Sequence, residues 1–115
     1  LTRFSGKPAP PLQGGSKTDM EAYSHEVIST GFWVGDDNIR EPAFYTYAYP
    51  EPENLAEQAL QPGAATWQHQ YGYTMAFMPY EAVRTSADPA HTLRTYLQSA
   101  FDCCADLMDW PADLR

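Results

Sequence analysis

The chain has 115 residues and a formal net charge of −8. Its length allows one domain, and a hydrophobic fraction of 43% is ordinary for a globular protein, so disorder is not expected. The seven basic residues are scattered rather than clustered, which argues against binding to nucleic acid or to an anionic membrane surface. No apolar run approaches the roughly 18 to 20 residues that a membrane span requires.

The N-terminal segment is rich in proline and glycine. Residues 1–20 are expected to form a linker or surface loop, because SGKPAPPLQGGSKTD at 5–19 has no hydrophobic period. The opening LTRFSG is typical of the end of a strand, so we expect a fragment or a processed product. Residues 21–115 are expected to form a single α+β domain belonging to a larger fold.

Two aromatic segments predict neighbouring strands. Residues 21–33 and 43–49 both alternate side-chain types with a period of two, and GDDN at 35–38 is a turn signal. The pair is therefore expected to form an antiparallel hairpin. Pro50 and Pro52 end the second strand because proline cannot donate a ladder hydrogen bond.

The middle of the chain gives weaker signals. One helical turn is expected around Leu55 to Leu60, and a third strand at 71–78, with an extension back to Trp67 left open. The run PYEAVR at 79–84 fits either a bend or a helical turn.

The last element is the clearest. Asp88 and Pro89 supply an N-cap and a proline at the first helical position, so a helix is predicted from Pro89 to about Met108. We expect an antiparallel sheet of three or four strands with this amphipathic helix packed on one face, an α+β fold. The apolar stripe that would contact the sheet consists of Leu93, Tyr96, Leu97, Ala100, Cys104, Leu107 and Met108.

The two cysteines are adjacent, at positions 103 and 104. Neighbouring helical side chains diverge by about 100°, so a disulfide between Cys103 and Cys104 would require a broken helix. We expect two reduced thiols, with Cys104 facing the core, and a cytoplasmic location.

Five strings resemble a known family in their order and spacing. RFSGKPAPP, EAYSHEVISTGFW, PAFYTYAYPEPE, PYEAVRTSADP and LQSAF…ADLMDW are similar to the C-terminal part of a family of uncharacterised bacterial proteins, recorded only as a domain of unknown function. The full-length members have about three hundred residues, which agrees with a fragment. The resemblance implies no reaction and no cofactor. It does imply an open sheet edge, covered by a second copy of the chain or by the missing N-terminal region.

His25 and Glu26 are the natural place to look for acid–base or metal chemistry. Adjacent strand residues point to opposite faces, however, so the two side chains do not share a site unless a bulge intervenes. A metal site would have to draw on His25, His69 and His91, which show no ligand spacing. We therefore expect neither a metal nor a cofactor.

The best binding feature is a row of tyrosines. Tyr45, Tyr47 and Tyr49 alternate along one strand and present their rings on one face, a platform for sugars, planar ligands or a protein partner. The opposite face would be the buried one, with Phe44, Thr46 and Ala48. Burial of both faces is the competing interpretation.

Two functional hypotheses follow. The favoured one is a ligand- or protein-binding domain that uses Tyr45, Tyr47 and Tyr49. The alternative is a hydrolase-like enzyme with His25 as general base, assisted by Glu51 or Glu81, which follow predicted strands.

Overall fold

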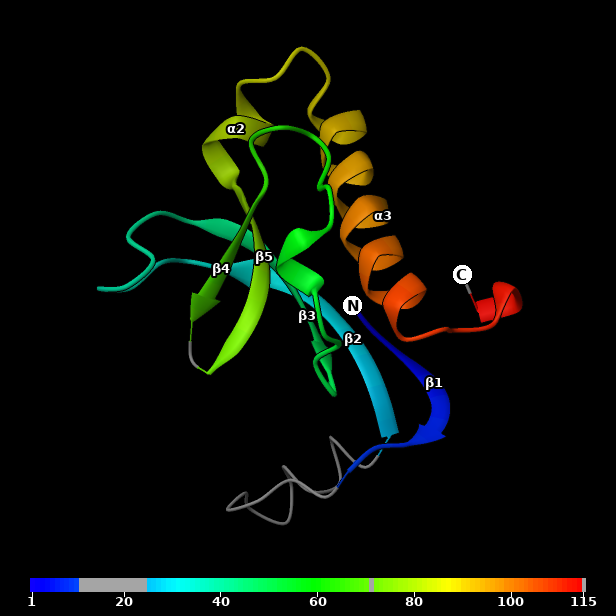
Figure 1. The fold of residues 1–115 in the computed structure, drawn as a ribbon. Coiled ribbons are helices and arrows are strands. Elements are labelled where there is room, and N and C mark those ends of the chain that lie inside the picture. Colours follow the sequence, from blue (N-terminus) through cyan, green and yellow to red (C-terminus); the bar gives the residue numbers. More distant parts are fainter. Residues whose placement is uncertain (11–24, 71, 115) are drawn as a thin grey trace.

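The computed structural model describes residues 1–10, 25–70 and 72–114. Within these residues, five strands, two α-helices and two 3-10 helices follow one another (Figure 1). In chain order they are β1 (Thr2–Pro8), β2 (His25–Trp33), β3 (Ala43–Tyr49), η1 (Leu55–Glu57), β4 (Thr66–Gln70), β5 (Tyr73–Pro79), α2 (Tyr80–Arg84), α3 (Pro89–Leu107) and η2 (Ala112–Leu114).

The strands form one antiparallel sheet in the order β1-β2-β3-β5-β4. The α+β class and the C-terminal helix are thus confirmed, although the sheet has five strands rather than three or four. The β2–β3 hairpin is also confirmed, with Ile28 opposite Ala48 and Trp33 opposite Ala43. β1 and β4 are the two edge strands, and a partner across such an edge stays a prediction.

The first additional strand is β1. The linker expected over residues 1–20 is wrong for Thr2–Pro8, which pairs with β2, and residues 11–24 lie outside the described part of the chain. The pairing is regular at Phe4, opposite Val27, and shifts register before Pro8, opposite His25. Gly6 and Pro8 lie where this edge strand becomes irregular. An edge position tolerates them because one side of the strand has no ladder partner.

The second additional strand comes from dividing the third predicted one. β4 and β5 form a tight hairpin in which Gln70 pairs with Tyr73. Gly72 has φ +83°, a left-handed conformation that glycine adopts without steric cost. The predicted extension back to Trp67 is therefore a separate strand.

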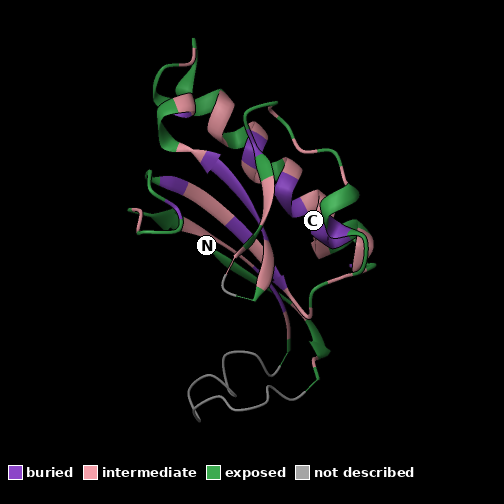
Figure 2. Ribbon diagram, turned by 60° about the vertical axis from the view of Figure 1, so that its left-hand side comes forward, coloured by how far each residue is buried: buried purple, intermediate pink, exposed green. Residues whose placement is uncertain are grey.

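α3 lies along one face of the sheet, which we call the helix face (Figure 1). Its N-cap is confirmed, because the Oδ1 atom of Asp88 accepts a hydrogen bond from the His91 amide at 3.1 Å. Figure 2 shows the buried side of α3 turned towards the strands. The buried residues of α3, which form part of the hydrophobic core between helix and sheet, are Tyr96, Ala100, Phe101, Cys104 and Ala105.

The smaller helices pack on the same face. Val83 of α2 and Leu55 of η1 join the clusters that contain α3, and residues 80–84 are helical rather than a bend. As predicted, Cys103 and Cys104 are both free thiols, and Cys104 is buried.

A buried chain of hydroxyl groups joins α3 to three strands. The Tyr96 hydroxyl lies 3.1 Å from the Thr46 hydroxyl and donates to the Ala76 carbonyl, also at 3.1 Å. Thr46 in turn lies 2.9 Å from the hydroxyl of Thr30. Because Thr46 and Tyr96 are fully buried, these bonds satisfy polar atoms that water does not reach.

Among the described residues, none of the helices has the length and apolar character that crossing a membrane demands.

Candidate functional site

The tyrosine row lies on the opposite side of the sheet from the helices. Tyr45, Tyr47 and Tyr49 alternate with Thr46 and Ala48, whose side chains are buried on the helix face. The three tyrosines are half-buried rather than enclosed. We call this side of the sheet the tyrosine face; the helices α2 and α3 contact the other side.

Register brings further aromatic and apolar residues onto the tyrosine face. Phe77 of β5 pairs with Tyr45. On the neighbouring strand β2, Gly31 pairs with Tyr45, and Trp33 lies two residues further along on the same face. Met75 lies two residues before Phe77 and therefore points to the same face.

These side chains line an open cavity of about 270 Å³, which we call the tyrosine pocket. Trp33 is 38% exposed and forms part of its rim, whereas Met75 and Phe77 are buried. Among the described residues, no charged side chain lines it. Its lining residues are Trp33, Tyr45, Tyr47, Met75 and Phe77.

Tyr45 and Tyr47 line the tyrosine pocket, whereas Tyr49 does not. The rings of Tyr45 and Tyr47 are stacked, with centroids 6.1 Å apart and planes 16° from parallel. Tyr47 also contacts the ring of Tyr73 at 5.9 Å. Tyr49 is not a lining residue, and its hydroxyl donates a hydrogen bond to the Pro10 carbonyl at 2.7 Å.

His25 and Glu26 begin β2 and point to opposite faces, as strand alternation requires. His25 is exposed and lies on the tyrosine face, two residues before Val27, the partner of Tyr49. It does not line the tyrosine pocket. The Oε1 atom of Glu26 accepts a hydrogen bond from the Ser5 hydroxyl at 2.7 Å, which attaches β1 to β2.

Glu51 and Glu81 lie at opposite ends of the sheet. β3 and β5 are antiparallel, so their C-terminal ends lie at opposite ends of the sheet. Glu51 follows the end of β3, and Glu81 follows the end of β5. The Oε1 atom of Glu51 accepts a hydrogen bond from the Thr74 amide. Glu81 is exposed and binds Arg84 through both carboxylate oxygens. His25 and Glu51 thus lie towards one end of the sheet, and Glu81 is remote from both.

The Glu81–Arg84 pair also changes the acidity of the carboxyl group. The hydrogen bonds from the Arg84 guanidinium hold the pKa of Glu81 below its usual value. An exposed i,i+3 pair of this kind is typical of a solvated helix surface.

The three histidines lie on separate elements. His69 is exposed in the edge strand β4, and His91 is exposed in the first turn of α3. Within the described ranges, no three His, Cys, Asp or Glu side chains are grouped so that they could hold a metal ion.

The sequence pattern predicts Tyr45 and Tyr47 as binding residues but not Trp33, Met75 or Phe77, which also line the pocket. Trp33 was placed in the correct strand, and its alternation with Gly31 is a signal for a shared face. Met75 and Phe77 belong to a strand that is separate in sequence, so their position depends on the β3–β5 register.

Comparisons with curated proteins and with solved structures each returned no match. A family model described as "Family of unknown function (DUF5996)" matches residues 1–115. The chain therefore belongs to the DUF5996 family.

Proposed function

We propose that this domain is a binding module whose ligand places a planar, uncharged ring in the tyrosine pocket. The observation that carries the proposal is the composition of the lining: the described residues that form it are five aromatic or apolar side chains. Binding sites for small molecules are typically concave and mostly apolar, with few polar groups. The polar groups of the lining side chains are the hydroxyls of Tyr45 and Tyr47 and the indole N–H of Trp33.

The size of the pocket supports a ring rather than a larger molecule. An apolar cavity of about 150 Å³ accommodates benzene, so about 270 Å³ suits a one- or two-ring group. The stacked pair Tyr45 and Tyr47 offers aromatic edges and faces, and ring–ring contacts add to the energy of apolar burial.

Indole is a suitable probe, because it is planar, neutral and carries one hydrogen-bond donor. Titration of the isotope-labelled protein with indole should shift the amide signals of Tyr45, Tyr47 and Phe77. Tyr47→Leu should weaken binding about tenfold, since a ring contact and a stacked partner are lost. Tyr80→Leu is the matched control, because Tyr80 is a partly exposed tyrosine that lies outside the pocket.

A tryptophan side chain of a protein partner offers the same ring as a free molecule. A short neutral peptide that contains one tryptophan is therefore the second arm of the titration. Tighter binding of the peptide than of indole would identify a protein ligand, and the reverse would identify a free molecule. An affinity for indole that is the same in wild type and Tyr47→Leu would contradict the proposal.

The partner predicted across an open sheet edge is a separate proposal. β4 is short and exposed at one edge, and strand addition there would form new main-chain hydrogen bonds. Light scattering at increasing protein concentration tests for a second copy. A mass that stays at that of one chain would contradict the homodimer.

A further inference from the structure

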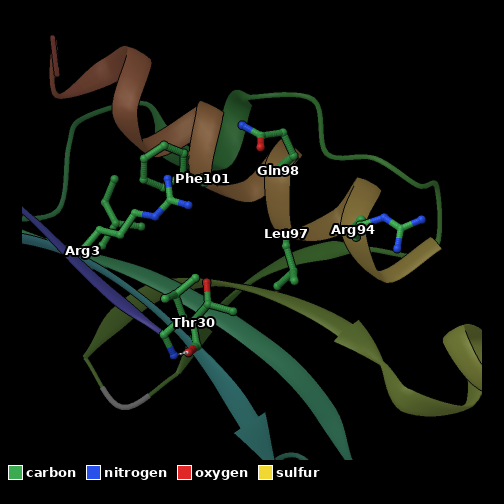
Figure 3. A pocket seen from close by; sticks show the side chains of 8 residues that line it. Arg3, Thr30, Arg94, Leu97, Gln98 and Phe101 are labelled. Carbon is green, nitrogen blue, oxygen red and sulfur yellow. Dashed lines mark hydrogen bonds between the residues drawn. The ribbon is translucent and has the colours of Figure 1, made fainter. Parts of the chain in front are cut away.

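A second cavity, of about 220 Å³, lies on the helix face between α3 and strands β1 and β2 (Figure 3). It is separate from the tyrosine pocket and shares no lining residue with it. Its walls combine apolar side chains with two arginines, so we call it the arginine pocket. The residues on which the argument rests are Arg3, Ile28, Arg94, Leu97 and Phe101.

The charge of this pocket is opposite to that of the protein. The chain has 15 acidic and seven basic residues, yet the described residues that line the cavity include two arginines and no carboxylate. Within the described residues, neither Arg3 nor Arg94 has a carboxylate at ion-pair distance. The neighbouring carboxylates of Glu26 and Asp102 accept hydrogen bonds from Ser5 and Gln98 instead.

Arg3 is held in place by an aromatic ring. It stands opposite Ile28 in the β1–β2 ladder, and its guanidinium carbon lies 4.5 Å from the centroid of the Phe101 ring. A cation–π contact of this kind orients the guanidinium while leaving its N–H donors available. Figure 3 shows Arg3 and Arg94 at opposite ends of the pocket, with Leu97 between them.

The apolar residues define the rest of the ligand. Ile28 is buried at the base, and Leu97 and Phe101 project from successive turns of α3. Since about 150 Å³ holds a benzene ring, about 220 Å³ holds a ring with a short acidic substituent.

From this arrangement we propose that the arginine pocket binds a small organic carboxylate with an apolar body. The carboxylate accepts hydrogen bonds from the Arg3 guanidinium, a geometry that suits bidentate pairing. The apolar body contacts Leu97 and Phe101. Arg94 supplies a second positive charge at the far rim. This site is independent of the proposed function of the tyrosine pocket.

Phenylacetate and phenylacetamide are matched probes, because they share one apolar body and differ in charge. Titration of the labelled protein with phenylacetate should shift the amide signals of Thr30, Leu97 and Phe101. Phenylacetamide should bind about tenfold more weakly. Added salt should weaken the binding of phenylacetate and leave that of phenylacetamide unchanged.

Variants assign the effect to the arginines. Arg3→Gln should lower the affinity for phenylacetate about tenfold, and Arg94→Gln should lower it severalfold. Arg3→Lys keeps the charge but loses the bidentate geometry, so its affinity for phenylacetate should fall between those of wild type and Arg3→Gln. Arg40→Gln is the control, because it removes the same charge from a loop that does not line this pocket.

Three results would overturn the proposal. One is equal affinity for phenylacetate and phenylacetamide, and a second is unchanged binding by a folded Arg3→Gln variant. The third is the absence of shifts at Thr30, Leu97 and Phe101 with millimolar phenylacetate. Shifts confined to Tyr47 and Met75 count as the third result, because they report the tyrosine pocket instead.

Discussion

Gly31 leaves free the space that the phenol of Tyr45 occupies. The two residues are partners in the β2–β3 ladder, on the tyrosine face. A Cβ atom at position 31 would lie 2.6 Å from Cζ and 2.9 Å from Cε2 of the Tyr45 ring, closer than side chains approach one another. The position of the Tyr45 ring over β2 therefore depends on the absence of a side chain at Gly31. One wall of the tyrosine pocket depends on it as well.

We expect Gly31→Ala to displace the Tyr45 ring while the domain stays folded. The clash involves the far end of a rotatable side chain. Replacing glycine by alanine also lowers the conformational entropy of the unfolded chain, which stabilises the folded state by about 0.4–1 kcal/mol. The free energy of unfolding should thus change by less than about 1 kcal/mol. The contacts between the rings of Tyr45 and Tyr47, measured as nuclear Overhauser effects, should disappear.

Gly63→Ala is the matched control for this variant. A Cβ atom at Gly63 would meet no atom within 4 Å, so the ring contacts should persist. Unchanged Tyr45–Tyr47 contacts in Gly31→Ala would contradict the dependence of the ring position on Gly31. Indole titration of both variants then links the ring position to the proposed binding.

Tyr96→Phe should destabilise the domain by about 1–3 kcal/mol. The substitution removes the hydroxyl that donates to the Ala76 carbonyl and contacts Thr46, and it leaves two buried polar groups with one partner fewer. Chemical denaturation measures the change. The slope of unfolding free energy against denaturant should not change, because the same surface is exposed on unfolding.

Tyr80→Phe provides the comparison for this second substitution. Tyr80 is 42% exposed, so loss of its hydroxyl should change the free energy of unfolding by less than about 0.5 kcal/mol. Equal effects of the two substitutions would show that the buried hydroxyl of Tyr96 does not stabilise the fold.

Patterns among neighbouring residues predict the helices and strands whose defining interactions are formed by residues close in the sequence. The Asp88–Pro89 start, the apolar stripe of α3 and the alternation in β3 all follow from neighbouring residues, and the structure agrees with them. The burial of Thr46 and Ala48 beneath α3 also follows from alternation alone.

Features that depend on distant pairing could not be predicted in this way. β1 is held by its ladder with β2, whose partner residues lie 17 to 27 positions away in the sequence, and its Gly and Pro content resembles that of a loop. Gly72, directly before Tyr73, is a usable sequence signal for this hairpin, since it follows an alternating run. The tyrosine pocket requires Trp33 and Phe77 to meet at one face, which only the register of three strands determines.

Asp88→Ala should destabilise α3 by about 0.5–2 kcal/mol, the usual effect of losing an N-cap side chain. The lost interaction is the hydrogen bond from the His91 amide to the Asp88 carboxylate. Asp88→Asn keeps an acceptor oxygen at this position and should remain close to wild type. If both variants lose equal stability in thermal denaturation, the charge of Asp88 matters rather than its capping hydrogen bond.

The Cys104 thiol should make the stability of the domain depend on alkaline pH. Burial raises the pKa of Cys104 from its ordinary value near 9 to about 12, because the thiolate is poorly solvated in the core. The folded state therefore holds the proton more tightly than the unfolded state. This contribution to stability is complete below pH 9 and is lost as the pH rises from about 9 to about 12.

Cys104→Ala isolates this contribution from those of other groups that titrate at alkaline pH. The difference in free energy of unfolding between wild type and Cys104→Ala should narrow steadily as the pH rises from 9 to 11, because only wild type loses the stabilisation of the neutral buried thiol. The half-buried Cys103 is the comparison: its pKa is also raised by burial, but the thiol is partly solvated, so Cys103→Ala should show less narrowing. A constant difference between wild type and Cys104→Ala across this range would mean that the Cys104 thiolate is tolerated in the folded core.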